Sequence, residues 1–359
     1  MDIVLHDYFE SAEGGGRLSL ILAQAMGADL AYGFKVKNHP FFEEMLLLGK
    51  QYKVSSFTDI QIWRQYKIAR AFAGRTGFLK DYHTAIYSGF YTPLAVYNHP
   101  VGRNIYYCHT PPRFLYDQKD FYLSLIKPWQ RPILETFNRY LQPKYEAAVK
   151  KMDLVIANSK NVQARIGKYL GIDSQIIHPP CDVDQYKWLS QGDYYLSTAR
   201  LDPLKRVDLV IDAFKDLPEK KLIMASGGPE LEKIIRLTDK IPNIEVLGWV
   251  SEDELHQLIG NCLATIYIPV DEDFGMSPVE SMAAGKPVIG VAEGGLQETI
   301  IHGETGHLIP SEPSLVDIIE GVLALSSEKA LKMRSACEER ARMFRKEVFI
   351  EKMQQIIEG

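Results

Sequence analysis

The sequence predicts an α/β protein of two domains, each a doubly wound parallel sheet covered by helices on both faces. Short β-rich runs alternate with helical periodicity along the chain, as repeated βα units do. The 359 residues exceed what one hydrophobic core usually serves, which favours two domains. Residues 178–184 contain consecutive prolines, which forbid a helix and suit a connection between domains.

The β-rich runs form two series, one on each side of the proline-rich connection. The expected strands are residues 2–6, 84–87, 104–108 and 153–157 in the first series, and residues 194–197, 221–225, 244–247, 264–268 and 287–291 in the second.

The domain boundary is placed in the proline-rich connection. The first domain is then expected to span residues 1–183 and the second residues 184–340, with residues 341–359 as a final helical segment. From about residue 327 to residue 358 the helical periodicity continues without a strand signal. The chain is therefore expected to end in helices only.

Composition is that of a soluble globular protein, with 46% hydrophobic and 24% charged residues. No apolar run approaches the roughly 20 residues that a membrane-crossing helix needs, and the first residues do not resemble a signal peptide. The four cysteines lie far apart without metal-ligand spacing, so they are interpreted as buried, reduced side chains. A cytoplasmic location is expected.

Charge is unevenly distributed along the chain. Residues 1–183 carry 22 Lys and Arg against 16 Asp and Glu, a net charge of +6, and the remaining residues carry 19 against 30, or −11. The basic half indicates an anionic partner such as a phosphate or a membrane surface, whereas no nucleic-acid partner is expected. One basic, aromatic-containing stretch could contact anionic lipid, although a solvated helix face is the commoner alternative. That stretch contains Trp63, Arg64, Lys67, Arg70, Arg75 and Lys80.

Residues 272–280 form the most informative motif. It follows an expected strand and opens a helix, with Ser277 or a neighbour at the N-cap and Pro278 in the first turn. Glu272 and Glu280 lie eight residues apart, the first on a loop at the carboxyl end of the strand, where open α/β sheets bind ligands. A carboxylate accepts hydrogen bonds from adjacent sugar hydroxyls. The alternative is that Glu280 only interacts favourably with the helix dipole and that Glu272 is solvated.

Residues 199–206 place up to three cations after another expected strand. Arg200, Lys205 and Arg206 lie near a helix start, where positive charge opposes the helix dipole. That cost suggests a nearby anion such as a diphosphate, whose charge grows as a sugar leaves it. A solvated charged loop is the alternative.

Two weaker signals lie in the first domain. Gly14, Gly15 and Gly16 precede a helical run and permit close approach of a phosphate or sugar, although an ordinary turn is as plausible. They do not form a complete dinucleotide-binding fingerprint, which argues against a dehydrogenase. His109 and Arg113 follow an aromatic-rich strand and are expected at the carboxyl edge of the first sheet, or His109 is simply structural.

Two acidic triplets, residues 182–184 and 271–273, resemble short metal-binding motifs of some sugar transferases. Neither is accompanied by evident further oxygen ligands, and cations already present could neutralise a diphosphate. No metal or other cofactor is therefore expected. Residues 293–298 form a Gly-containing turn into a helix, whose amides could bind a ligand or serve only as a turn.

Taken together, these segments resemble the family 4 retaining glycosyltransferases of the GT-B fold over nearly the whole chain. The 272–280 motif with the following residues 281–289 is the most specific carrier of the resemblance, and the glycine triplet is the least. The other carriers are residues 108–113, residues 157–159, Arg200 with Lys205, and Gly294 and Gly295 with Glu298.

The resemblance implies two Rossmann-like domains facing each other across a cleft, with the final helix crossing back to the first domain. Glu280 would hold the ribose, Glu272 the donor-sugar hydroxyls, and Arg200 and Lys205 the diphosphate. His109 would lie near the transferred sugar. The residues so assigned to the nucleotide sugar also include Gly15, Gly16, Phe274, Gly275, Met276 and Ser277, and those assigned to the acceptor are Gly14, Arg17, His109 and Arg113.

The same resemblance implies a hexosyltransferase that retains the anomeric configuration without a metal. The motifs are most similar to those of bacterial mannosyltransferases of surface-polysaccharide assembly, so GDP-mannose is the expected donor and a saccharide or lipid-linked saccharide the acceptor. Arg17 stands where many relatives have an acidic residue, which would suit a phosphate-bearing acceptor. A UDP- or ADP-sugar transferase, a nucleotide-sugar epimerase and a non-catalytic sugar-binding protein are the alternatives.

Overall fold

The computed structural model describes residues 1–10, 14–37 and 39–358, and the chain forms two compact units. Unit 1 comprises Met1–Pro179 together with Ile350–Gly359, and unit 2 comprises Pro180–Phe349. The division falls four residues before the boundary expected from the sequence. Each unit contains one parallel sheet covered by helices, which confirms the predicted fold class of two Rossmann-like domains.

The sheet of unit 1 has seven strands, all parallel, in the order β3-β2-β1-β4-β5-β6-β7. The four runs expected in this half form strands, whereas β2, β3 and β7 were not picked out because they are two to four residues long. The strands are β1 Asp2–His6, β2 Asp29–Tyr32, β3 Gln51–Lys53, β4 Thr84–Ser88, β5 Arg103–Cys108, β6 Leu154–Ala157 and β7 Gln175–Ile176.

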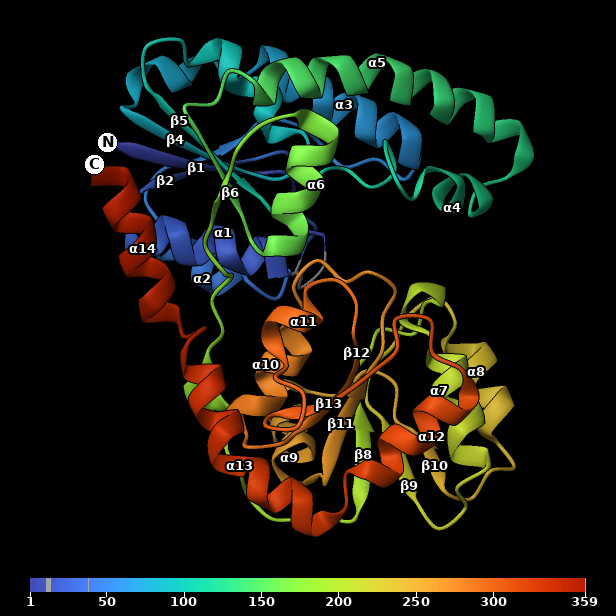
Figure 1. Ribbon diagram of the computed structural model, residues 1–359. Coiled ribbons are helices and arrows are strands. Elements are labelled where there is room, and N and C mark those ends of the chain that lie inside the picture. The colour runs from blue at the N-terminus through green and yellow to red at the C-terminus, as the bar shows by residue number, and fades with distance from the viewer. Residues whose placement is uncertain (11–13, 38, 359) are drawn as a thin grey trace. The chain divides into compact units, whose positions relative to one another are not determined.

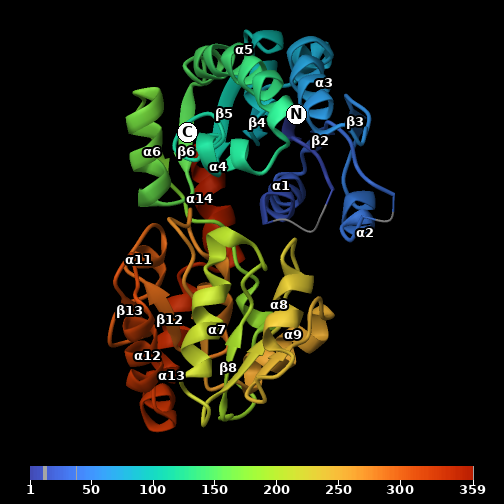
Figure 2. The same cartoon turned by 90° about the vertical axis from the view of Figure 1, so that its right-hand side faces the viewer.

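Helices cover both faces of this sheet, with α3 and α5 on one side and α1 with the end of α14 on the other (Figures 1 and 2). The helix α6 shows the local signals well, since Ser159 caps its start by accepting from the Val162 amide and Gly171 ends it in left-handed backbone. The helices are α1 Gly14–Ala25, α2 Phe42–Leu46, α3 Gln61–Gly74, α4 Lys119–Ser124, α5 Arg131–Val149 and α6 Lys160–Leu170, with 3-10 turns η1 Gly77–Asp81, η2 Thr92–Asn98 and η3 Pro128–Gln130.

The core of unit 1 contains several large aromatic side chains. Tyr87, Tyr106 and Tyr107 come from the two central strands β4 and β5 and are fully buried. Each hydroxyl has a partner, because Tyr87 donates to Asn104 Oδ1 at 2.7 Å, Tyr107 donates to the Ile177 carbonyl at 2.8 Å, and Tyr106 lies 3.1 Å from the Tyr145 hydroxyl. Burial is therefore achieved without leaving these polar groups unsatisfied.

The sheet of unit 2 has six parallel strands in the order β10-β9-β8-β11-β12-β13. All five expected runs form strands within a residue of their predicted ends, and β13 was not expected. The strands are β8 Tyr194–Ser197, β9 Lys221–Met224, β10 Ile244–Val246, β11 Ala264–Tyr267, β12 Val288–Val291 and β13 Gly306–Ile309.

Helices again form two layers, with α7 and α12 on one face of this sheet and α10 and α13 on the other (Figures 1 and 2). The chain ends in α13 and α14 with no strand among the described residues beyond β13, as expected for the helical end. The helices are α7 Val207–Lys215, α8 Leu231–Thr238, α9 Glu252–Asn261, α10 Met276–Ala283, α11 Leu296–Thr299, α12 Leu315–Ala324, α13 Ser327–Arg342 and α14 Lys346–Glu358, with 3-10 turns η4 Val183–Gln185 and η5 Pro203–Lys205.

The last part of α14 belongs to unit 1, where Arg103 donates to the Ile357 carbonyl at 2.9 Å. Residue 359, the end of the expected final segment, lies outside the described residues. The four cysteines are buried and form no disulfide bond, as expected. Among the described residues no helix combines the length and the apolar character required to cross a bilayer.

Each sheet contains one point at which the strand order reverses. In unit 1 it lies between β1 and β4, and in unit 2 between β8 and β11. The chain leaves the two strands at such a point in opposite directions, so their carboxyl ends border a crevice, which is where open parallel sheets bind ligands. The segments after β8 and β11 are those that the sequence selected in the second domain.

Candidate functional site

The first half of the site is the segment that follows β8. Asp202 caps the 3-10 turn η5, its carboxylate accepting from the Leu204 amide at 3.0 Å, and Lys205 is the last residue of that turn. Arg206 then caps the start of α7 in left-handed backbone. Lys205 therefore lies in a separate turn before α7 rather than at the start of that helix.

The second half is the segment that follows β11. Tyr267 ends the strand, Glu272 lies on the loop, and α10 begins after Gly275. The N-cap expected at Ser277 or a neighbour is Gly275, at φ 92°, and Ser277 is the second helical residue. Only glycine adopts this backbone conformation without strain. Pro278 does lie in the first turn of α10, as predicted.

The two segments meet through three side chains. The Lys205 Nζ lies 2.5 Å from Glu272 Oε2 and donates to the Tyr267 hydroxyl at 3.0 Å, and the Tyr267 hydroxyl donates to Glu272 at 3.0 Å. The segments are also joined through the main chain, since the Val270 amide donates to the Leu204 carbonyl at 2.8 Å. The reversal point of the sheet thus carries a closed triangle of cation, phenol and carboxylate.

Electrostatics keep this cluster charged. Burial works to lower the pKa of Lys205, but the Tyr267 oxygen and the Glu272 carboxylate outweigh it and raise that pKa above its usual value. Burial, reinforced by Glu272, raises the pKa of Tyr267, so its hydroxyl stays protonated. The cluster therefore presents a fixed ammonium and a fixed phenol proton beside one carboxylate.

The cations after β8 were expected to need a nearby anion, and the structure provides carboxylates from the protein itself. Glu272 pairs with Lys205, and Glu293 lies 3.3 Å from the guanidinium of Arg206. Arg206 also lies 3.4 Å from the Pro269 carbonyl. Arg206 therefore braces the loop after β11, while Lys205 remains the better candidate for a ligand contact.

Backbone strain marks the same two segments. Arg206 at φ 51° and Asp271 at φ 44° are the non-glycine residues with left-handed backbone among residues that the structure describes. Each is the direct neighbour of one member of the Lys205–Glu272 pair. Left-handed backbone costs a non-glycine residue on the order of 1 kcal/mol, and such residues concentrate at functional sites.

A glycine turn after β12 supports the loop that carries Glu272. The Gly295 amide donates to the Glu272 carbonyl at 2.8 Å. A Cβ on Gly295 would lie 2.4 Å from the Phe274 Cα, and one on Gly294, whose φ is 57°, would lie 2.5 Å from the Glu272 carbonyl oxygen. The predicted glycine pair therefore allows two backbone segments to approach each other and positions Glu272.

Arg200 and Glu280 lie on the same elements as the pair. Arg200 is exposed. Burial raises the pKa of the nearby Asp202 carboxyl group, and the positive charge of Arg200 partly offsets that rise. Glu280 is partly buried in the second turn of α10. The structure thus joins Lys205 to Glu272 directly and leaves Arg200 and Glu280 on the flanking loop and helix.

Among the other residues predicted near the nucleotide sugar, Phe274 is buried in the core with its ring 5.3 Å from that of Phe344. Its backbone is then the part that a ligand could reach. Sequence reasoning did not assign Tyr267 and Asp202. Tyr267 could have been found as the polar residue that ends the strand before the motif.

In unit 1 the reversal point also carries a polar cluster. The Ser88 hydroxyl, at the end of β4, lies 2.8 Å from His109 Nε2 and 2.9 Å from the Ser19 hydroxyl of α1. The Ser19 hydroxyl lies 3.0 Å from His6 Nδ1 at the end of β1 and 2.8 Å from the Gly15 carbonyl. His109 thus lies at the carboxyl edge of the first sheet, and its ring contacts Gly15 closely enough that an added Cβ would touch it.

Both histidines of this cluster are neutral. Burial lowers the pKa of His6 to about 4, and burial together with the neighbouring His6 lowers the pKa of His109 to about 3. His6 Nδ1 lies 2.9 Å from the Ser88 carbonyl, which can only accept, so this nitrogen carries the ring proton. The cluster is therefore an uncharged hydrogen-bonding group at neutral pH.

These lowered pKa values predict that the chain loses stability as the pH falls. The folded histidines stay neutral below the ordinary pKa of 6.5, while the unfolded chain takes up protons, so stability is lost from about pH 6.5 down to about pH 4 for His6. As the pH falls from about 7.5 to about 5, His6 alone should lower the free energy of unfolding by on the order of 2 kcal/mol. His6→Gln is expected to flatten the fall in melting temperature over this range, and a slope equal to that of the wild type would contradict the interpretation.

Arg113 and Arg17 were both expected to bind an acceptor. Arg113 forms an ion pair with Asp117, one turn away, at 3.0 Å from Nε and 2.5 Å from NH2, so it is held by the protein. Arg17 is partly buried in α1, and Gly14 is exposed in its first turn. An added Cβ on Gly14 would meet no atom within 4 Å, so that glycine borders open space.

No group of three or more His, Cys, Asp or Glu side chains is placed to hold a metal ion in residues 1–10, 14–37 and 39–358. The two acidic triplets therefore do not converge with further ligands in this part of the chain. Metal independence of the activity stays a prediction.

Comparison with known families finds a match in unit 2. Residues 182–344 match the family model of glycosyl transferases group 1. The second unit is therefore similar to the glycosyltransferases of that family. The match contains the Lys205–Glu272 pair, the glycine turn and Glu280.

Curated relatives of the chain include mannosyltransferases. It is 26% identical over 252 residues to alpha-1,3/1,6-mannosyltransferase ALG2 of Dictyostelium discoideum, a match covering 57% of each protein. It is 27% identical over 198 residues to the human GDP-Man:Man(3)GlcNAc(2)-PP-Dol alpha-1,2-mannosyltransferase, covering 46% of this chain and 40% of that one. The chain thus spans between about two fifths and three fifths of these relatives.

A solved structure extends the likeness in fold to both units. The chain resembles Anabaena Alr3699/HepE, solved in complex with UDP and glucose, with a TM-score of 0.77. The match covers 100% of this chain and 99% of that one at 17% identity. This likeness establishes the two-domain GT-B fold and not the ligand.

Proposed function

We propose that this chain transfers a hexose from a nucleotide-sugar donor to an acceptor. One observation carries the proposal: the 2.5 Å pair of Lys205 and Glu272 lies at the reversal point of the sheet in a unit that is similar to group 1 glycosyltransferases. Donor binding requires a cation that contacts the leaving diphosphate and a carboxylate that accepts from the sugar hydroxyls. Burial and the Tyr267 contacts hold both groups in place before a ligand arrives.

Roles for the individual residues follow from their chemistry. Glu280 accepts from the ribose hydroxyls, and Glu272 accepts from hydroxyls of the donor sugar. Lys205 and exposed Arg200 meet the diphosphate. As the bond between the anomeric carbon and the phosphate oxygen breaks, negative charge grows on that oxygen, and the two cations stabilise it. The acceptor hydroxyl forms the new bond to the anomeric carbon and passes its proton to the leaving phosphate.

GDP-mannose is the donor we propose, with retention of the anomeric configuration. The mannosyltransferase relatives support mannose, and the name of the human relative specifies a GDP-linked sugar. The complex of Alr3699/HepE with UDP and glucose makes a UDP-sugar the competing donor. Two cations next to the diphosphate take over the charge neutralisation that a metal would provide, so the reaction is proposed to be independent of metal.

A thermal-shift screen followed by a transfer assay tests this proposal. A ligand that binds only the folded state raises the melting temperature. At a ligand concentration 100 times the dissociation constant, it stabilises the folded state by about 2.7 kcal/mol. GDP and GDP-mannose are expected to give larger shifts than UDP, ADP and their sugars, and chelator should leave the transfer rate unchanged. NMR of the product should show the donor's anomeric configuration. A sugar changed on the nucleotide without an acceptor would indicate an epimerase and overturn the proposal.

Unit 1 is proposed to bind the acceptor, a saccharide or lipid-linked saccharide of bacterial surface-polysaccharide assembly. Gly14 borders open space at the start of α1 and Arg17 is partly exposed in the same helix, whose Gly15 lies against His109. We further propose that the protein acts in the cytoplasm and touches the inner face of the membrane through unit 1. Trp63, which is 52% exposed on α3, and the basic residues around it support that contact.

A further inference from the structure

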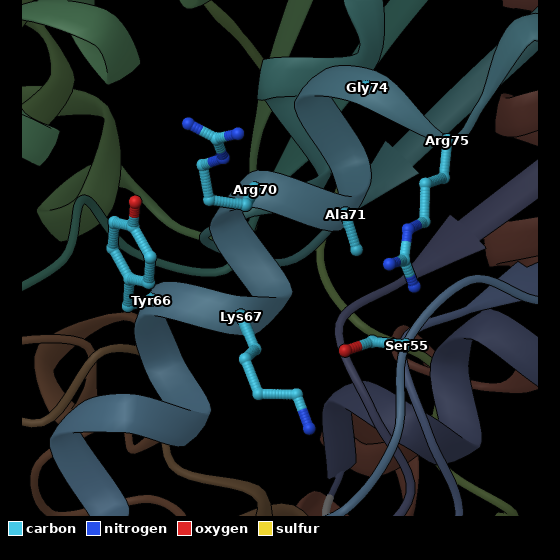
Figure 3. Close-up of a pocket in the computed structure, with 7 residues that line it drawn as sticks. All are labelled: Ser55, Tyr66, Lys67, Arg70, Ala71, Gly74 and Arg75. Atoms are coloured by element: carbon cyan, nitrogen blue, oxygen red, sulfur yellow. The ribbon is translucent and has the colours of Figure 1, made fainter.

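Unit 1 contains a hollow that none of the residues assigned to the donor or the acceptor lines. It has a volume of about 330 Å³ and lies between the second half of α3 and the segment after β3 (Figure 3). Its size is at the lower end of the range for small-molecule sites. The residues that line it are Ser55, Tyr66, Lys67, Arg70, Ala71, Gly74 and Arg75.

Three of the lining residues are cations, and none is acidic. Among residues 1–10, 14–37 and 39–358, no ion pair involves Lys67, Arg70 or Arg75. Lys67 donates to the Ser56 hydroxyl at 2.8 Å, and Arg75 lies 3.4 Å from the Val54 carbonyl, so their partners are neutral. The hollow therefore has an excess of positive charge that the surrounding protein does not neutralise.

This arrangement differs from an ordinary solvated helix face. Figure 3 shows Lys67 and Ala71 on successive turns of α3 on the side of Ser55 and Arg75, while Tyr66 and Arg70 project from the adjoining side. The Arg75 guanidinium points toward Ser55 from the end of the helix (Figure 3). The Lys67 ammonium, the Arg75 guanidinium and the Ser55 hydroxyl thus lie on one side of α3, and the Arg70 and Tyr66 side chains extend away from them (Figure 3).

The donors suit the oxygens of a phosphate group. The Lys67 ammonium acts as a point charge, the Arg75 guanidinium offers a planar fork, and Ser55 adds a hydroxyl donor. Two cations match the roughly two negative charges of a phosphate monoester better than the single charge of a carboxylate. We propose that this hollow binds the phosphate group of a phosphate ester. The inference does not depend on the transfer reaction, because none of these residues belongs to the donor site.

An apolar rim next to the hollow indicates what the phosphate carries. The Trp63 ring stacks on Tyr66 with centroids 5.3 Å apart, and Ile60, just before α3, is 67% exposed. An aromatic ring and an aliphatic side chain beside a cationic pocket suit an ester with an apolar portion, either a lipid headgroup at a membrane surface or a soluble ester. The two sources share the phosphate, so the experiment must separate them.

The test uses the full chain with two probes. Glycerol 3-phosphate in solution is titrated by calorimetry, and phosphatidylcholine vesicles with and without phosphatidic acid are used for co-sedimentation. The variant K67Q/R75Q removes two pocket charges. Its control K53Q/K80Q removes two charges from exposed Lys53 of β3 and exposed Lys80, neither of which lines the hollow. Melting temperatures close to the wild type confirm that both variants fold.

A second pair of variants tests whether binding needs the open space of the hollow, with the charges of its lining residues left unchanged. An added Cβ on Gly74 or on Gly77 would meet no atom within 4 Å, so both positions accept a larger side chain. Gly74 lines the hollow and Gly77 does not. Gly74→Phe is therefore expected to block phosphate binding while Gly77→Phe leaves it intact, with all charges present in both proteins.

K67Q/R75Q and Gly74→Phe are expected to weaken binding at least about tenfold relative to their controls, the first because it removes charge-assisted hydrogen bonds and the second because it fills the space. Loss of vesicle binding alone assigns the site to a lipid headgroup, and loss of glycerol 3-phosphate binding alone assigns it to a soluble ester. Loss of both supports the pocket for either source. Unchanged binding, or equal weakening in K53Q/K80Q, overturns the proposal.

Discussion

Lys205→Met is expected to lower kcat by roughly 10³-fold while the protein stays folded, because removing one preorganised charge contact to a leaving group costs on the order of 10²–10³. The substitution removes the ammonium that lies between Tyr267 and Glu272 and that we assign to the diphosphate. Methionine keeps most of the length of the side chain, so the packing around Tyr267 is preserved.

Glu272→Gln is the companion variant. It keeps the shape of the side chain but removes the charge that raises the pKa of Lys205 and the acceptor that we assign to sugar hydroxyls. The expected loss is again roughly 10²–10³ in kcat. Because the two residues act as a pair, the double variant should be little worse than the worse single variant, as is usual for groups in direct contact.

The control for both is Lys215→Met on α7, which breaks the exposed pair of Lys215 with Asp212. Exposed pairs contribute little to stability, so neither the rate nor the melting temperature should change appreciably. Turnover like that of the wild type in both Lys205→Met and Glu272→Gln would remove the proposed donor site.

Gly295→Ala is expected to have the next largest effect after these two substitutions, a loss of about 100-fold in kcat. Its Cβ would lie 2.4 Å from the Phe274 Cα and 2.6 Å from the Asp273 carbonyl oxygen, so the loop that carries Glu272 must move away. Displacing a catalytic group by about 1 Å can cost roughly 10²-fold. The residue does not need left-handed backbone, so the effect comes from the contact and not from conformational strain.

Gly167→Ala in α6 is the matched control, because an added Cβ there would meet no atom within 4 Å. Alanine should raise helix stability slightly. Transfer rates and nucleotide-induced thermal shifts are measured for both variants. Equal rates in the two would show that the glycine turn does not position Glu272.

Much of the fold follows from local patterns in the sequence. The strands that end at His6, Cys108, Ser197 and Tyr267 were found within a residue because each is an apolar run bounded by polar residues. The edge strands β3 and β7 were not found, since two or three residues give no periodicity to detect. Their position depends on pairing with neighbours that are distant in the chain.

The candidate site was predicted in part. Glu272, Glu280, Arg200 and Lys205 were selected from motifs, and the expected anion near the cations exists, but as Glu272 and Glu293. Tyr267 was missed because a tyrosine at the end of a strand is more often a core residue. The ring does lie in the core, and only its hydroxyl reaches the pair.

The sequence by itself determined which segments become strands, helices and polar loops, because periodicity and capping act between neighbours a few residues apart. Only the tertiary structure decided which loops meet. Lys205 and Glu272 are 67 residues apart, and they touch because β8 and β11 pair at the point where strand order reverses and because Gly294 and Gly295 let the loop after β11 pack closely. Contacts of that kind depend on the order of strands in the sheet, a long-range property that no local pattern of residues contains.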